Sequence, residues 1–233
     1  MNNNEFISEL KKINIDITKN QLEALEKYYE LLIEWNKKIN LTRIIDKKEV
    51  YLKHFYDSIT LIKAINLNEK LNVCDIGTGA GFPGIVLKII FPNLNITLVD
   101  SLNKRIEFLN LVIKELNLKD IKAIHERGEE HTRNNRNKYD LITCRAVSRL
   151  NVISEICIPG LKINGYFIPM KANIEEELKD IKFLDNLSSE IENIITFKLP
   201  IEDSIRNLIV IKKIKNVSDI YPRSYDKIIK RPL

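Results

Sequence analysis

Glycines and acids with the spacing of a nucleotide-binding loop are the residues of this chain best suited to chemistry. The segment Asp-Ile-Gly-Thr-Gly-Ala-Gly-Phe-Pro-Gly runs from Asp75 to Gly84, and an apolar helical pattern follows from Ile85 to Phe91. Because glycine has no Cβ, such a loop lets the backbone approach a ligand at the carboxyl end of a strand. Asp100 closes the next apolar run, about twenty residues past the loop, where α/β folds place the carboxylate that binds a ribose. The pattern predicts a site for a cofactor that contains adenosine.

The spacing of the glycines distinguishes between two such cofactors. A dinucleotide site has the form G-x-G-x-x-G, and its helix N-terminus faces a pyrophosphate. Here the glycines run G-x-G-x-G-x-x-G, and Asp75 stands two residues before the first. A carboxylate there would repel a pyrophosphate and suit a cationic ligand, and S-adenosyl-L-methionine has an ammonium, a sulfonium and no phosphate. We therefore expect S-adenosyl-L-methionine rather than NAD. The glycines could alternatively form only a tight turn. The position of Asp100, about twenty residues past the loop, disfavours that alternative.

Length and composition bound the class of protein. The chain has 233 residues, of which 44% are apolar and 30% charged, which suits one α/β domain with an appendage or two small domains and argues against extended disorder. No apolar run reaches the roughly 18 residues of a membrane span, and the polar start is not a signal peptide. Cys74, Cys144 and Cys157 are widely spaced in apolar segments, so we expect buried, reduced thiols and no metal site. A cytoplasmic protein without a membrane partner is expected.

Positive charge is concentrated in two stretches of the chain. Residues 212–233 contain seven basic and two acidic residues, which equals the net charge of +5 of the whole chain. A second stretch, 37–53, contains six basic and two acidic residues. Concentrated positive charge is typical of proteins that bind a phosphate-bearing partner, although a solubilising tail has the same composition.

The first part of the chain has the pattern of helices. Thr18 and Gln21 have the spacing of a capping box, and the apolar positions from Leu22 to Ile39 recur in steps of three and four. A second helical pattern covers about 48–65. These residues, 1–65, are predicted to form a helical cap packed on the main domain.

From Leu71 onward the sequence pattern alternates between strands and helices. This alternation predicts an α/β fold with a parallel, doubly wound sheet. The predicted strands are 71–76, 94–100, 121–125, 139–144, 163–170, 191–198 and 206–213, and the predicted helices are 84–91, 102–117, 148–157 and 173–184. Only 200–204 link the last two strands, and a parallel crossover needs a dozen residues or more, so strand seven is predicted to be antiparallel. This is the seven-stranded, Rossmann-like sheet of a methyltransferase, with the domain over 66–214 and a basic tail over 215–233.

Polar residues follow other strands at the edge where ligands bind. Gly128 and Glu129 come after the third strand, where a carboxylate can accept from an adenine amine, and a solvated pair of Glu129 with Glu130 is the alternative. Arg145 ends an otherwise apolar strand, so its charge needs a partner, either a structural carboxylate or a ligand. Cys144 beside this cation is a weak candidate for a nucleophile of lowered pKa. No general base is evident, which fits a nucleophile with a free lone pair such as guanine N7.

Motifs over nearly the whole chain resemble one known family. They are Trp-Asn-x-x-x-Asn-Leu-Thr at 35–42, His-x-x-Asp-Ser at 54–58, the loop at 75–84 with its Pro-Gly end, Asp-Ser-Leu-x-Lys-Arg at 100–105, Cys-Arg-Ala at 144–146, and the basic ends at 221–223 and 230–233. This set resembles the RsmG (GidB) family of bacterial methyltransferases that act on guanine N7 in 16S ribosomal RNA. The chain departs from the family at Ala172, where a glycine is usual, and over 223–230, where many members carry a glycine and a proline.

The resemblance implies roles for particular residues. By motif match, the resemblance implies that S-adenosyl-L-methionine is bound by Gly77, Phe82, Gly128, Glu129 and Arg145. The spacing of the glycine loop and the acid after it adds Gly79 and Asp100. The resemblance names no catalytic residue, and Arg145, His54 and Asp57 are candidates for positioning the guanine. His54 and Asp57, three apart on one helical face, could instead bond to each other. The candidates for RNA contact are Lys171, Arg223, Lys227, Lys230 and Arg231.

The expected partner is 16S rRNA or the small ribosomal subunit, and the expected oligomeric state is a monomer. Two alternatives stay open at this point. One is a methyltransferase that uses S-adenosyl-L-methionine on another substrate. The other is a ribosome-binding factor that keeps the fold without catalysis.

Overall fold

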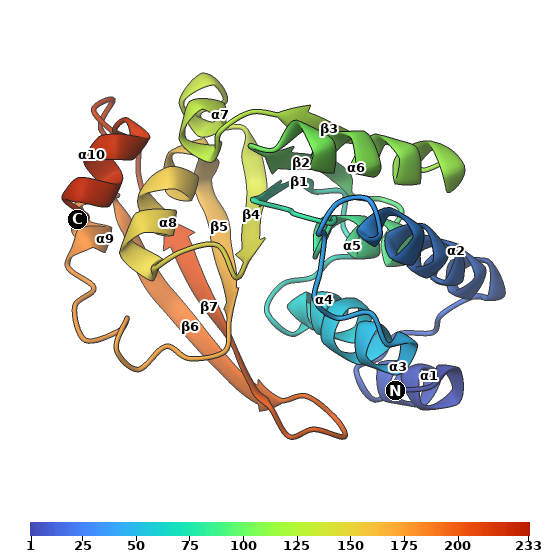
Figure 1. Cartoon of the computed structure of the whole chain (residues 1–233). Coiled ribbons are helices and arrows are strands. Elements are labelled where there is room, and N and C mark those ends of the chain that lie inside the picture. Colours follow the sequence, from blue (N-terminus) through green and yellow to red (C-terminus); the bar gives the residue numbers. More distant parts are fainter.

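A seven-stranded sheet forms the centre of the molecule (Figure 1). The computed structural model describes residues 1–233. The strands are β1 (Asn72–Ile76), β2 (Asn95–Asp100), β3 (Ile121–His125), β4 (Tyr139–Arg145), β5 (Leu161–Lys171), β6 (Ser189–Lys198) and β7 (Ile205–Lys213). Their order across the sheet is β3-β2-β1-β4-β5-β7-β6. This order and the parallel pairing of the first five strands confirm the predicted doubly wound fold.

The last two strands form an antiparallel hairpin that adds to the edge of the parallel part. β7 lies between β5 and β6 and is antiparallel to both, with Phe167 paired to Ile211 on one side and Ile195 paired to Leu208 on the other. The prediction of an antiparallel strand seven is therefore confirmed. Its physical reason is the short link after β6, which leaves a hairpin as the only available connection.

Helices cover both faces of the sheet, and alternate residues along each strand serve the two faces. On β1, Val73 belongs to the apolar cluster with the N-terminal helices, α5 (Gly84–Ile90) and α6 (Asn103–Glu115). The next residue, Cys74, belongs to the cluster with α8 (Leu150–Cys157), α9 (Phe183–Asn186) and the C-terminal residues. The carboxyl ends of β1 to β4 therefore lie between two buried layers, which fixes the positions of the residues that follow them.

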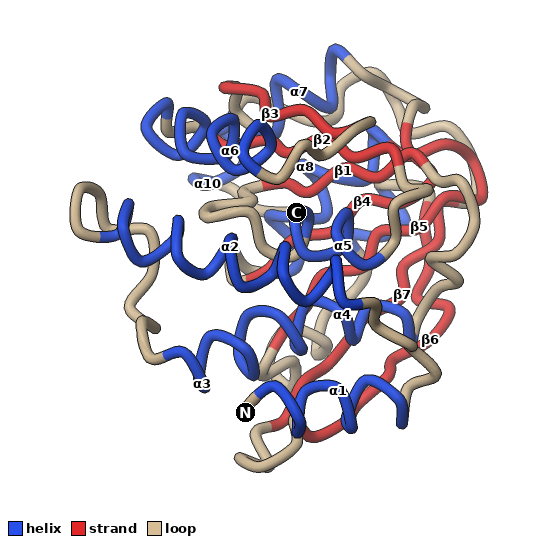
Figure 2. Tube along the Cα trace, turned by 90° about the vertical axis from the view of Figure 1, so that its right-hand side faces the viewer, coloured by secondary structure: helices blue, strands red, loops and turns tan.

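The N-terminal residues form helices that pack beside α5, as Figure 2 shows. They are α1 (Asn3–Lys12), α2 (Lys19–Asn36), α3 (Lys47–Val50), a π-helical turn (Tyr51–Tyr56), α4 (Asp57–Ile59) and a 3-10 turn (Thr60–Lys63). The predicted capping box of α2 is confirmed, since Gln21 N donates to Thr18 Oγ1 and Thr18 N donates to Gln21 Oε1. None of the helices has the length and hydropathy that a crossing of a lipid bilayer requires.

One predicted helix is wrong, and one observed helix was not predicted. The polar stretch 126–138 contains helix α7 (Gly128–Asn134), which lacks an apolar stripe because its buried side chains are Glu129, His131 and Thr132. The helix expected over 173–184 is a series of turns that precedes α9. There Glu177 accepts hydrogen bonds from Leu150 N and Lys171 Nζ, so contacts with distant residues override the local helical preference.

The basic residues at the C-terminus are packed on the domain. Ile228 of α10 (Tyr225–Lys230) is fully buried in the cluster around α8. The guanidinium of Arg223 donates to both carboxylate oxygens of Glu155, at 2.8 and 2.6 Å. The segment 215–233 is thus a docked element with an exposed basic side.

Candidate cofactor and acceptor site

The glycine loop after β1 is tied to two neighbouring strand ends. Gly77 has a φ of +68°, and a Cβ on it would lie 2.8 Å from a methyl carbon of Val147 beyond β4. Any L side chain would be strained in that backbone and would displace Val147. The N–H of Gly79 donates to Asp100 Oδ2 at the end of β2, at 2.9 Å. The loop therefore holds the ends of β1, β2 and β4 in one arrangement.

Asp75 has a role different from the one that its charge suggested. Its side chain is fully buried and lines neither of the two cavities described below. Asp75 Oδ2 accepts from Thr78 Oγ1 at 2.7 Å and from Gly84 N at 2.9 Å, and burial raises the pKa of the carboxyl to about 6. Asp75 shapes the loop, so its charge does not by itself distinguish a sulfonium cofactor from a pyrophosphate.

A first cavity of about 280 Å³ lies beyond the carboxyl ends of β1, β2 and β3. It brings together four of the residues predicted to bind the cofactor, Gly77, Asp100, Gly128 and Glu129. Ligand pockets span roughly 300–1,000 Å³, so this cavity is near the lower end of the range. Its residues follow three different strands, as expected for a ligand site in an open α/β sheet.

Asp100 is the central polar group of this first cavity. The side chain is buried, and its Oδ1 accepts from Leu102 N at 3.0 Å while its Oδ2 accepts from Gly79 N. Arg105 Nη1 forms an ion pair with Oδ2 at 3.1 Å. The two backbone bonds fix the carboxylate at the end of β2, and the ion pair with Arg105 compensates its charge.

Gly128 and Glu129 form the side of the first cavity next to β3. A Cβ on Gly128 would lie 2.9 Å from methyl carbons of Ile156 and Ile76, so the backbone there packs without a side chain. Glu129 is buried, which raises its pKa, whereas Glu130 is exposed. The alternative of a solvated acidic pair is therefore wrong for Glu129.

A second cavity of about 460 Å³ adjoins the first beyond β4 and β5. His54, Asp57, Arg145 and Lys171 line it together with Arg206 of β7. Ala146 and Val147 belong to the walls of both cavities. These two residues therefore form a thin partition between the first and second cavities.

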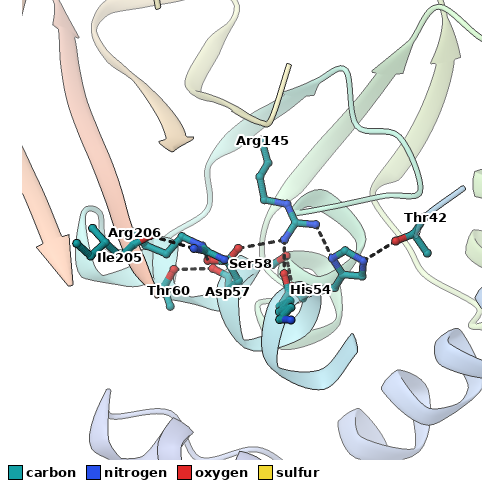
Figure 3. A network of polar contacts seen from close by, with 9 residues as sticks. Thr42, His54, Asp57, Ser58, Thr60, Arg145, Ile205 and Arg206 are labelled. Atoms are coloured by element: carbon teal, nitrogen blue, oxygen red, sulfur yellow. Dashed lines mark hydrogen bonds and ion pairs between the residues drawn. The ribbon is translucent and has the colours of Figure 1, made fainter. Parts of the chain in front are cut away.

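Arg145 is the centre of a polar network in the second cavity (Figure 3). It donates to His54 Nδ1 and to the carbonyl of Lys53, both at 2.9 Å, and pairs with Asp57 Oδ2 at 3.3 Å. Arg206 Nε pairs with the other oxygen of Asp57 at 3.2 Å. His54 and Asp57 thus contact Arg145 and not each other. A partner for this cation was expected from the sequence, and its mostly buried guanidinium has three.

His54 is held as a neutral acceptor. Burial, together with the charge of Arg145, lowers its pKa to about 3. Since Nδ1 accepts from Arg145, the proton is on Nε2, which lies 2.9 Å from Thr42 Oγ1. Both ring nitrogens are occupied, so this histidine is a poor general base.

Phe82 lines neither cavity. Its ring is buried and stacks on His54 with centroids 4.4 Å apart, and the guanidinium carbon of Arg145 lies 5.1 Å from the ring centroid. Phe82 therefore supports the network from behind. The predicted role of Phe82 in cofactor binding stays a prediction.

Cys144 does not have the character of a nucleophile. All three cysteines are buried, as expected. Burial raises the pKa of the Cys144 thiol, and this effect outweighs the opposing charge of Lys171. The suggestion of a lowered pKa at Cys144 is wrong.

The residues predicted to contact RNA fall into two groups. Lys171 is mostly buried in the second cavity and pairs with Glu177 at 2.7 Å, and Arg223 is occupied by Glu155. Both cations pair with carboxylates in the free protein, and their assignment to RNA contact stays a prediction. Lys227, Lys230 and Arg231 are exposed on and after α10.

The family follows from comparison with known sequences. Residues 21–199 match the family described as rRNA small subunit methyltransferase G (GidB). The ribosomal RNA small subunit methyltransferase G of Bacillus subtilis (strain 168) is 51% identical over 227 residues, which cover 96% of this chain and 95% of the relative. The chain belongs to this family. The match confirms the family resemblance of the sequence motifs.

Solved structures give the same fold for this member of the GidB family. A SAM-dependent methyltransferase from Aquifex aeolicus has a TM-score of 0.54 at 17% identity, covering 78% of this chain and 98% of that one. Fibrillarin from Aeropyrum pernix, solved with S-adenosyl-L-methionine, has a TM-score of 0.51 at 17% identity, covering 65% and 72%. At these identities the likeness shows the fold alone. It confirms the Rossmann-like methyltransferase sheet.

Two residues that line the cavities, and one that contacts His54, were missed from the sequence. Thr42 contacts His54, Arg206 pairs with Asp57, and Tyr225 of α10 lines the first cavity. Thr42 is part of a family motif, and that was its only signal. Arg206 and Tyr225 come from β7 and α10, and no local pattern indicates that these elements reach the strand ends.

Proposed function

We propose that this GidB family member transfers a methyl group from S-adenosyl-L-methionine to N7 of a guanine in 16S ribosomal RNA. The substrate is the RNA or the small ribosomal subunit, and the enzyme acts as a cytoplasmic monomer. Family membership supports the substrate class. The observation that supports the reaction is the pair of adjoining cavities that share the partition of Ala146 and Val147.

The first cavity fits the adenosine part of the cofactor. Gly77 and Gly128 line this cavity with backbone that carries no side chain, and Asp100 offers a carboxylate to the ribose hydroxyls. Glu129 and the neighbouring backbone can accept from the adenine amine. When bound, the cofactor supplies an electrophilic methyl group on a sulfonium.

The position of the partition orients the cofactor. The reactive end has to face the acceptor, and the second cavity begins at Ala146 and Val147. The ribose is expected at Asp100 and the adenine at the opposite end, beside Gly128 and Glu129. In this orientation the methionine part points toward Arg145.

The second cavity fits the guanine. A base that is methylated has to leave the stack and enter a pocket. Arg145 and Arg206 bring N–H donors to this cavity, and guanine O6 is an acceptor next to N7. N7 of guanine has a free lone pair and carries no proton, so a methyl acceptor held here would need positioning and no general base. The neutral, fully bonded His54 agrees with this.

A transfer assay with labelled cofactor tests the function. The protein, S-adenosyl-L-methionine with a labelled methyl group, and either 16S rRNA or small subunits from a strain that lacks the gene are mixed. Label is expected in the RNA, and borohydride–aniline cleavage, which reports N7-methylguanine, is expected at one new position. Label without the cleavage would overturn the N7 assignment, and no label in either substrate would overturn the proposed reaction.

A further inference from the structure

The C-terminal segment is anchored to the domain at several separate points. Glu155 of α8 is fully buried and accepts from both the backbone N–H and the guanidinium of Arg223. Arg133 donates to the carbonyl of Pro222 at 2.9 Å, and Asn151 donates to the carbonyl of Leu233 at 2.9 Å. In Figure 1, α10 lies next to α8 and α7, at the end of the chain. The position of α10 is therefore fixed by polar contacts on both sides of it.

This anchoring places one aromatic ring at the first cavity. Tyr225 is the first residue of α10, two residues after Arg223, and it lines the first cavity together with Glu129. The guanidinium carbon of Arg127 lies 4.9 Å from the centroid of the Tyr225 ring. Arg127 lines the same cavity. The ring thus has a cation–π partner that orients it, while 40% of its surface stays exposed.

The surroundings of Tyr225 have the chemistry of a purine site. Ile153 and Ile156 of α8 supply apolar walls to the first cavity, and Glu129 supplies a hydrogen-bond acceptor. A flat, weakly polar ring with an exocyclic amine matches apolar and aromatic walls next to a carboxylate.

We propose that Tyr225 contacts the adenine of the cofactor, so that the C-terminal segment forms one wall of the cofactor site. The inference rests on the proposed function for the identity of the cofactor. The adenine packs between the Tyr225 ring and the isoleucines of α8. The same helix carries Lys227 and Lys230 on its exposed side, so one element touches both the cofactor and the region assigned to RNA.

Calorimetry with S-adenosylhomocysteine and with adenosine tests this contact on the full chain. Tyr225→Ala is expected to weaken binding of both ligands by about tenfold, because the substitution removes the ring that packs on the base they share. Tyr225→Phe keeps the ring and is expected to bind as the wild type does. Ile229→Ala changes an exposed apolar residue of the same helix and serves as the matched control.

The outcomes separate this inference from the proposed function. Wild-type affinity in Tyr225→Ala, or an equal loss in Tyr225→Phe, would overturn the adenine contact while leaving the enzyme assignment intact. A loss in Ile229→Ala as large as in Tyr225→Ala would show that the helix and not the ring matters, and would also overturn it. Absence of binding by the wild-type chain would instead overturn the proposed cofactor.

Discussion

At the scale of single residues, Asp100 is the carboxylate that we expect to bind the ribose of the cofactor. It is buried at the end of β2 and accepts hydrogen bonds from Gly79 N and Leu102 N, so its orientation is fixed before a ligand binds. Asp100→Asn keeps the shape and removes the charge, and we expect affinity for S-adenosyl-L-methionine to fall by about 1–3 kcal/mol. Calorimetry measures the change. Glu107→Gln, an exposed carboxylate on α6, is the control. Unchanged affinity in Asp100→Asn would show that this acid does not bind the ribose.

His54 gives a prediction for the dependence of stability on pH. Its folded pKa of about 3 lies below the ordinary value of 6.5, so between these limits the unfolded chain binds a proton that the native chain does not. Stability therefore falls as the pH drops through this window, by up to about 1.4 kcal/mol per unit. In urea unfolding, the wild type is expected to lose about 2 kcal/mol more than His54→Gln between pH 7 and 5. His125→Gln, at an exposed histidine, should behave as the wild type. Equal losses in the wild type and His54→Gln would refute the buried neutral state.

At the scale of elements, the docking of the C-terminal segment depends on the ion pair between Arg223 and Glu155. Arg223→Met leaves the fully buried carboxylate of Glu155 without its partner, and we expect a loss of about 3 kcal/mol in the free energy of unfolding. The double variant Glu155→Leu with Arg223→Met removes both charges and is expected to recover most of that loss. If the single variant were as stable as the wild type, the pair would be a surface contact without consequence.

How far the sequence predicts the elements depends on where their contacts come from. The glycine loop, Asp100 and the parallel strands were predictable because spacing and apolar period are local properties. The turns over 173–182 were not, since Glu177 there bonds to Leu150 and Lys171. α7 was missed because its buried side is polar. Arg206 and Tyr225 reach the cavities only through the hairpin and the docked C-terminal segment. Local patterns do not encode that kind of long-range placement.

At the scale of the whole molecule, the exposed charges of α10 provide the test of RNA binding. Lys227→Gln with Lys230→Gln is expected to weaken binding of 16S rRNA and to reduce the slope of log affinity against log salt by about 0.7–0.9 for each phosphate that is no longer neutralised. Filter binding over a salt series measures both quantities. Lys114→Gln with Lys119→Gln changes two exposed lysines that precede β3 and serves as the control pair. Equal effects of the two pairs would mean that the affinity for RNA depends only on the net charge of the protein, and would contradict the assignment of α10.

The position of β7 inside the sheet has a consequence for incomplete chains. Because β7 lies between β5 and β6, a chain cut before Ile205 loses the pairing partner of β5 as well as that of β6. The apolar residues Phe167 and Ile168 would then belong to an open edge strand, which is a template for pairing with other molecules. Chains truncated before β7 should therefore aggregate through β5, and they also lack Arg206 and Tyr225, which line the two cavities.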